Sequence, residues 1–155
     1  LALAMEPAEG EVMKRPPRDP REGIFAHGLG VFCIWVGLLM AALCIGVQYR
    51  EISAGNEDWE TMVFTVIVLS QLTTALAVRS EKESLFKLGL RSNKTMLGAV
   101  ALGVALQLAV TYVPFLNPVF DTKPLTAGEL LFCVALSFVP FAVIEIEKFV
   151  KRKKG

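Results

Sequence analysis

The stretch that decides the fold is IFAHGLGVFCIWVGLLMAALCIGVQY, residues 24–49, which contains no Asp, Glu, Lys or Arg. A helix rises about 1.5 Å per residue, so about 20 apolar residues cross the hydrocarbon core of a bilayer. Three further apolar stretches of comparable length follow along the chain. The predicted spans are residues 24–49, 59–78, 95–115 and 125–146. The sequence therefore predicts an all-α membrane protein with four transmembrane helices.

The composition agrees with this class. Hydrophobic residues make up 54% of the 155 residues and charged residues 20%, and the charges collect between the apolar stretches. Such segregation is expected because a charge in the middle of a bilayer costs at least a few kcal/mol. The net charge of +1 predicts no nucleic-acid partner. Cys33, Cys44 and Cys133 lie singly in apolar stretches, which favours buried thiols over disulfides or a zinc site.

The basic residues predict the orientation. All but two of the 16 Lys and Arg residues lie in the N-terminal segment, the middle loop and the C-terminal tail; the exceptions are Arg50 and Lys123. Basic loops stay on the cytoplasmic side, so both termini are predicted to be cytoplasmic. The expected organisation is a cytoplasmic loop (1–22), a membrane domain (23–148) and a basic cytoplasmic tail (149–155).

Four prolines lie within or between the last two predicted spans. Pro114, Pro118 and Pro124 bracket a short turn between the third and fourth spans, where helix-breaking residues are expected. Pro140 lies inside the fourth span and is expected to kink it, with neighbouring helices satisfying the freed carbonyl.

The second span carries polar side chains at mid-membrane depth. Gln71 and Thr74 lie three residues apart and share a face, next to Ser70 and Thr73. Their oxygens could replace part of the hydration shell of a hard cation, which makes Gln71 and Thr74 candidate residues of a cation path. The alternative is an interhelical hydrogen bond from Gln71 and hydroxyls bonded to their own helix. Gln107 in the third span is expected to serve in helix packing.

Catalytic motifs are absent from the sequence. No phosphate-binding Gly-rich loop and no nucleophile elbow is present, and the chain has a single His. We therefore expect no catalytic residue, no bound cofactor and no enzymatic activity of the chain by itself.

Three segments resemble a known family. Residues 5–18, MEPAEGEVMKRPPR, resemble the cytoplasmic loop that follows the sixth helix of P-type cation pumps. Residues 61–80 look like the eighth helix of that family, and residues 145–152, EIEKFVKR, resemble the end of its tenth. The resemblance covers essentially the whole chain and is strongest to the calcium-transporting pumps, with sodium and proton pumps left open.

The resemblance implies helices seven to ten of a ten-helix pump driven by ATP. Ca²⁺ and Mg-ATP are then implied for the complete pump only, because the DKTG phosphorylation sequence is absent here. The implied partners are the lipid bilayer and the remaining helices and cytoplasmic domains. Leu1-Ala-Leu-Ala looks like the exit of the sixth helix, so the chain is expected to be a piece of a longer protein.

The resemblance also suggests roles for individual residues. Gln71 matches a position where two-site calcium pumps have a glutamate, so a neutral donor would bind Ca²⁺ more weakly. Glu9 and Glu11 match acidic positions of a loop that couples the membrane part to the phosphorylation domain; a solvated charged loop is the alternative. Lys14 departs from that loop's pattern.

The rival interpretation is a free-standing four-helix membrane scaffold or regulatory subunit without transport activity. A small channel would need polar stripes on several helices, and only the second span has one. Arg- and Pro-rich loops without targeting motifs favour a multi-pass protein of a bacterial inner membrane. The sequence leaves the transported ion, the organism and the oligomeric state open.

Overall fold

The computed structural model describes residues 29–78 and 94–154, with side chains described for residues 30–78 and 94–150. Its helices are α1 (Leu29–Ser53), α2 (Trp59–Ala77), α4 (Lys94–Tyr112), α5 (Asn117–Phe120) and α6 (Ala127–Lys154). The four long helices are each long and apolar enough to cross a membrane. The predicted all-α fold with four membrane-spanning helices is therefore confirmed.

The helix ends differ from the expected limits in places. The expected start of the first span, residue 24, lies outside the described residues. α4 ends at Tyr112 although the expected span extends to residue 115, because Pro114 disfavours helical geometry at the residue before it. The connection that follows contains the short helix α5, and α6 continues as a helix through the expected tail boundary at residue 149.

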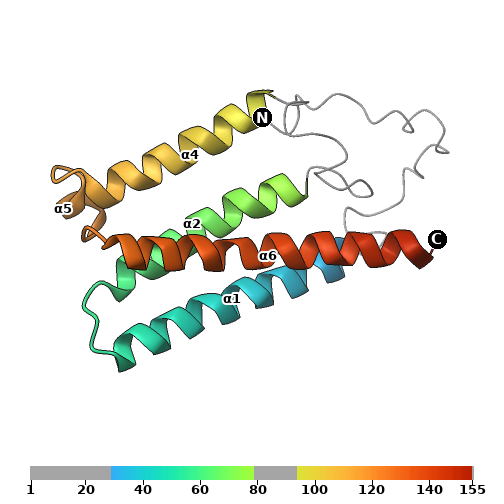
Figure 1. Cartoon of the computed structure of the whole chain (residues 1–155), viewed down its shortest axis with the longest axis horizontal. Coiled ribbons are helices and arrows are strands. Elements are labelled where there is room, and N and C mark those ends of the chain that lie inside the picture. Colours follow the sequence, from blue (N-terminus) through green and yellow to red (C-terminus); the bar gives the residue numbers. More distant parts are fainter. Residues whose placement is uncertain (1–28, 79–93, 155) are drawn as a thin grey trace.

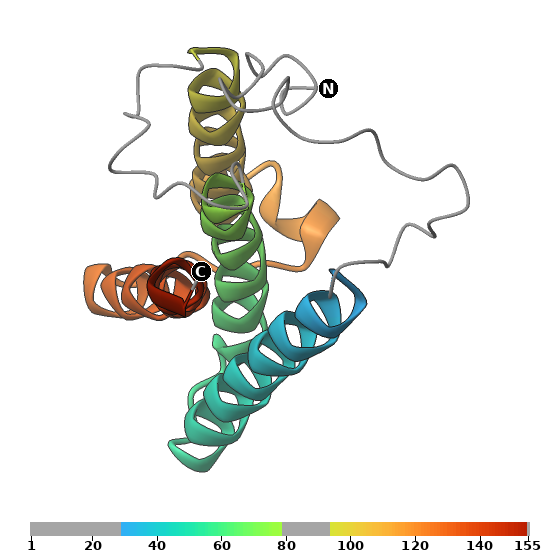
Figure 2. The ribbon, with the colours of Figure 1, turned by 90° about the vertical axis from the view of Figure 1, so that its right-hand side faces the viewer.

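α2 lies at the centre of the bundle. α6 packs along one side of α2, while α4 and α1 lie on two other sides (Figure 2). Helices that follow one another run in opposite directions, so the start of α1 and the end of α6 lie at one end (Figure 1). The α1–α2 loop and the connection from α4 to α6 meet at the other end, which we call the loop end (residues 50–62 and 117–132).

The core joins α1, α2 and α6. Near the loop end its buried members are Val47, Met62, Val66, Leu125 and Cys133. Toward the opposite end a second cluster contains Val36, Ala77 and Ile144. α2 contributes to both clusters, so its packing against α1 and α6 is continuous along the helix.

Lys148 on α6 bonds to α2 at the end opposite the loop end. Its ammonium group donates to the carbonyl of Ala77, in the last turn of α2, and pairs with Glu145. A cation at this position satisfies an orphan carbonyl and complements the helix dipole.

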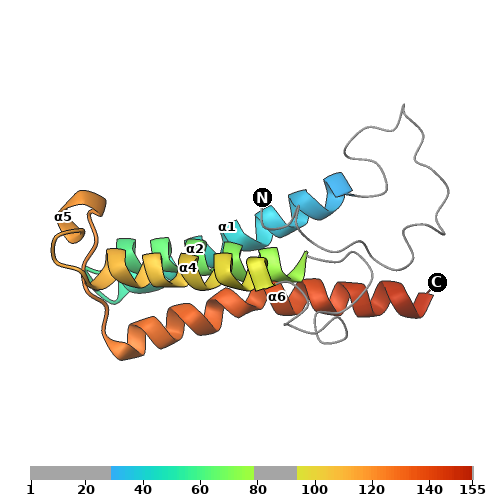
Figure 3. The same cartoon turned by 90° about the horizontal axis from the view of Figure 1, so that it is seen from above.

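Pro140 bends α6 near its middle, as expected (Figure 3). A proline lacks the backbone N–H that would bond to the carbonyl four residues earlier, here that of Leu136. The Thr73 hydroxyl on α2 donates to the next carbonyl, that of Ser137, at 2.7 Å. The bend is buried against the rest of the bundle, since Pro140 is among the fully buried residues.

α4 approaches α2 closely at a glycine. A Cβ built on Gly103 would lie 2.9 Å from Cδ2 of Leu72, closer than real contacts allow. The absence of a side chain at Gly103 therefore lets the two backbones come together, which is the usual function of small residues between membrane helices.

Candidate functional site

One face of α2 is left uncovered by the other described helices. Ile67, Gln71 and Val78 are exposed, and their spacing of four and seven residues places them on one side of the helix. We call these three residues the open face of α2. Buried residues of α2 such as Met62, Val66 and Ala77 point instead toward α1 and α6.

Gln71 therefore presents its amide away from the packed core. It forms no hydrogen bond with another described residue, so the interhelical bond considered as an alternative is not found among them. Thr74 lies one turn further along and is half-buried. Its hydroxyl oxygen is buried and has no hydrogen-bond partner among the described residues, and the same holds for Ser70.

The other hydroxyls of α2 are used in packing. Thr65 donates to the carbonyl of Thr61 at 2.7 Å, and Thr73 donates to the carbonyls of Ser70 and Ser137. Gln71 therefore presents its amide beyond the described helices, whereas the Ser70 and Thr74 hydroxyl oxygens are buried within them.

The side-chain oxygens of Ser70, Gln71 and Thr74 would be uncharged metal ligands. Within residues 29–78 and 94–154, no group of three His, Cys, Asp or Glu side chains could hold a metal ion. Ca²⁺ takes about 6–8 oxygen ligands, so α2 could supply only a fraction of a cation site. Glu9 and Glu11, the candidate coupling residues, lie outside the described residues.

Gln107 forms the interhelical contact expected of it. It is 4% exposed, and its amide donates to the Thr65 hydroxyl of α2 at 3.0 Å. The Thr111 hydroxyl, one turn later on α4, donates to the backbone carbonyl of Gln107 at 2.9 Å. Gln107 therefore belongs to the α2–α4 contact, as predicted.

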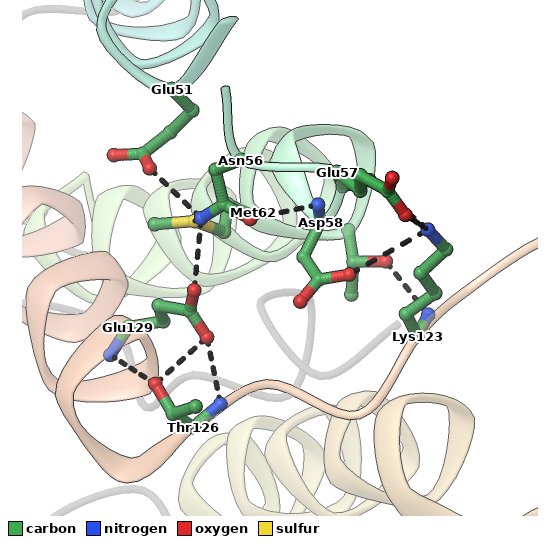
Figure 4. Close-up of polar contacts among 9 residues, drawn as sticks. Glu51, Asn56, Glu57, Asp58, Met62, Lys123, Thr126 and Glu129 are labelled. Carbon is green, nitrogen blue, oxygen red and sulfur yellow. Dashed lines mark hydrogen bonds and ion pairs between the residues drawn. The ribbon is translucent and has the colours of Figure 1, made fainter. Parts of the chain in front are cut away.

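A second polar site occupies the loop end (Figure 4). The amide nitrogen of Asn56, in the α1–α2 loop, donates to Glu51 of α1 at 3.0 Å and to Glu129 of α6 at 2.9 Å. The Asn56 side-chain oxygen accepts from the backbone N–H of Asp58 at 2.9 Å. The amide nitrogen thus has partners on α1 and α6, and the amide oxygen has a partner within the loop.

The two carboxylates are held from their other sides as well. Glu51 is 5% exposed and also accepts from Arg50, whose guanidinium lies 4.4 Å from the ring centroid of Phe132 on α6. The second oxygen of Glu129 accepts from the backbone N–H and the hydroxyl of Thr126, both at 2.8 Å. The Thr126 hydroxyl in turn accepts from the Glu129 N–H, which completes a capping box at the start of α6.

Lys123 adds a further link. Its ammonium group lies 3.3 Å from Glu57 and 3.8 Å from Asp58, both in the α1–α2 loop. Its backbone N–H donates to the buried Thr61 hydroxyl at 2.9 Å. The connection leading into α6 is therefore tied to the start of α2.

Reasoning from the sequence missed this loop-end site. The spacing Thr126-x-x-Glu129 is a recognisable capping-box signal and could have identified Glu129. Nothing local in the sequence indicates that Asn56 bridges Glu51 and Glu129, because Asn56 and Glu129 are separated by 73 positions.

Comparisons with known proteins point to one family. The sequence model described as "Cation transporting ATPase, C-terminus" matches residues 1–150. A calcium-transporting ATPase of Bacillus subtilis is 35% identical over 90% of this chain, and calcium-transporting ATPase 1 of Lactococcus lactis is 37% identical over 97%. Calcium-transporting ATPase 1 of Saccharomyces cerevisiae is 34% identical over 99%. The chain spans only 16–17% of the length of these relatives.

Proposed function

Because the chain belongs to the cation-transporting ATPase family through that family's C-terminal region, we propose that it is the C-terminal membrane segment of an ATP-driven Ca²⁺ transporter. In this proposal its four helices support the ion-binding helices of the pump, and α2 lines the cation path. The relatives named as calcium transporters support the choice of ion.

The observation that carries the proposal is the open face of α2. An amide exposed to hydrocarbon without a hydrogen-bond partner is unfavourable by several kcal/mol. Gln71 has none among the described residues. The Ser70 and Thr74 hydroxyls also lack a partner there, but their oxygens are buried inside the bundle. Further helices of a longer protein would cover this face and would bring the remaining ligands to the Gln71 oxygen.

The neutral donor set has a chemical consequence. Gln71 offers a carbonyl oxygen but no charge, so the formal charges that neutralise Ca²⁺ have to come from other helices. We therefore assign Gln71 and Thr74 to the wall of the cation path and give them a smaller share of ligation than carboxylates.

The experiment replaces Gln71 in the full-length pump and measures ATP-dependent Ca²⁺ uptake into vesicles. Gln71→Leu removes an oxygen, and a contact to a charged group is worth about 1.5–3 kcal/mol, so apparent Ca²⁺ affinity should fall about tenfold or more. Gln71→Glu adds a negative charge and should raise the affinity or change the number of ions carried per cycle.

Gln48→Leu serves as the control, because Gln48 is also exposed in its helix but lies on α1. It should leave Ca²⁺ affinity unchanged. Unchanged Ca²⁺ affinity and transport in both Gln71 variants would show that Gln71 serves only in packing between helices.

The remaining parts of the proposal concern the whole pump. Mg-ATP would bind in other domains, since no nucleotide-binding motif is present in this sequence. Glu9 and Glu11 would couple the membrane helices to the phosphorylation domain. The isolated chain would be inactive, and its partners would be the lipid bilayer, the other helices and the cytoplasmic domains. The bacterial inner membrane stays a proposal, because relatives come from bacteria and from eukaryotes.

The free-standing scaffold is the weaker alternative. It would leave the Gln71 amide facing lipid, and it does not explain a match over residues 1–150 to a family of larger pumps. Reading the coding sequence upstream of Leu1 distinguishes the two, because the proposal requires an in-frame DKTG.

A further inference from the structure

Asn56 holds two carboxylates with a single amide. Its nitrogen lies within hydrogen-bond distance of both acids, Glu51 at 3.0 Å and Glu129 at 2.9 Å, and 3.6 Å from the sulfur of Met62 on α2 (Figure 4). Hydrogen bonds to ionised groups are roughly twice as strong as those between neutral groups. The same donor also prevents two like charges from facing one another without a proton between them.

The position of Asn56 along the chain gives this contact mechanical importance. Asn56 lies between the last residue of α1, Ser53, and the first of α2, Trp59. Glu51 belongs to α1, and Glu129 lies in the first turn of α6, where the capping box with Thr126 fixes it. One side chain therefore connects the start of α2 to both neighbouring helices.

The contact is rigid because every polar group of the amide is engaged. The side-chain oxygen accepts from Asp58 N–H, and the Asn56 backbone N–H donates to the Glu51 carbonyl at 3.0 Å. Arg50 holds Glu51 from the other side and contacts Phe132 of α6. No rotation of Asn56 could keep one carboxylate contact without losing a second bond.

We propose that Asn56 is a positioning residue that fixes the height and rotation of α2 relative to α1 and α6, and thereby sets where Gln71 meets the cation. This inference rests on the proposed function for its effect on Ca²⁺, whereas the clamping of the three helices stands independently of it. The Asn56 amide contacts no transported ion in this proposal and acts only through the placement of α2.

The test exchanges donor and acceptor. Asn56→Asp keeps the size of the side chain but supplies a third carboxylate and no proton to Glu51 or Glu129. The double variant Asn56→Asp with Glu129→Gln restores a donor–acceptor pair with the roles reversed. Glu60→Gln with Asn56→Asp is the matched control, because it removes one negative charge from an exposed residue of α2 that does not contact Asn56.

The first measurement is a distance distribution between spin labels on Val78→Cys and Leu131→Cys in a cysteine-free full-length protein. Both positions are exposed; Val78 directly follows the last residue of α2, and Leu131 lies on α6. We expect one narrow distribution in the parent protein, a broadened one with Asn56→Asp, and recovery of the narrow one with Glu129→Gln but not with Glu60→Gln. Identical distributions in all variants, or equal recovery by both second substitutions, would overturn the clamp.

The second measurement is ATP-dependent Ca²⁺ uptake by the same variants without labels. Asn56→Asp should weaken apparent Ca²⁺ affinity about tenfold, with recovery by the Glu129→Gln exchange alone. Absence of Ca²⁺ uptake by the parent protein would instead contradict the proposed function. The clamping of the three helices by Asn56 would then be tested by the distance measurement alone. Normal affinity of Asn56→Asp together with a broadened distance would refute the link from the clamp to Gln71.

Discussion

At the scale of single residues, two glutamines within the membrane-spanning helices have different surroundings. Gln107 on α4 is 4% exposed and donates to Thr65 across the helix contact. Gln71 on α2 is exposed and has no such partner among the described residues. One amide is thus part of the bundle, and the other faces away from the described helices.

Replacing Gln107 with Leu should weaken the α2–α4 contact. The bond to Thr65 is lost, but Thr65 keeps its own bond to the Thr61 carbonyl and is not left unsatisfied. Interhelical hydrogen bonds in membranes are worth about 0.6–2 kcal/mol, and we expect a destabilisation of that size. Unfolding of the full-length protein in detergent measures it, with exposed Gln48→Leu as the control; equal stability of both variants would show that the bond contributes nothing.

The sequence could place both glutamines inside spans, because hydropathy and length locate helices reliably when every backbone group must be satisfied within lipid. It predicted the packing role of Gln107 but could not show which helix receives its hydrogen bond. The partner of Gln107, Thr65, is 42 positions away, and only the packing of α4 against α2 brings the two together.

At the scale of helices, the α2–α4 contact depends on Gly103. A methyl group there would press against the end of the Leu72 side chain, which can move, so Gly103→Ala should cost about 1 kcal/mol or less. Gly103→Val adds branching that Leu72 cannot avoid, and overpacking of this kind costs about 1–3 kcal/mol.

Gly98→Val on the same helix controls for the intrinsic helix preference of valine, since a Cβ at Gly98 meets nothing within 4 Å. Thermal unfolding in detergent should separate the two valine variants. Equal destabilisation by both would mean that Gly103 is not a contact point.

Which helices pack against one another could not be predicted from the sequence. Ala99 and Gly103 lie four residues apart, a spacing of small residues that is typical of close packing between membrane helices, but the spacing does not indicate which helix is the neighbour. Asn56 is less predictable still, because an asparagine in a loop ordinarily indicates only a turn. The bend at Pro140 was predictable since proline lacks a backbone donor, whereas the bond from the Thr73 hydroxyl on α2 to the Ser137 carbonyl near the bend was not.

At the scale of the whole molecule, the predicted orientation can be tested directly. The basic residues predict that the loop end is extracytoplasmic and the opposite end cytoplasmic. In a cysteine-free background, a membrane-impermeant maleimide should label Val119→Cys in intact cells, because this residue is 68% exposed at the loop end. Lys94→Cys, exposed at the start of α4, should react only after the membrane is opened. The reverse labelling pattern would invert the topology.

The central place of α2 also bears on how the protein is made. During synthesis α2 enters the membrane before α6 leaves the ribosome, so its Thr73 hydroxyl first has only the Ser70 carbonyl of its own helix as a partner. The carbonyl of Ser137 becomes available when the last helix inserts. A ribosome that stops before Ala127 would release a chain that lacks α6. The surface of α2 that packs against α6 would then be exposed to lipid. Membrane-bound proteases that remove incomplete proteins could recognise such a chain by this surface.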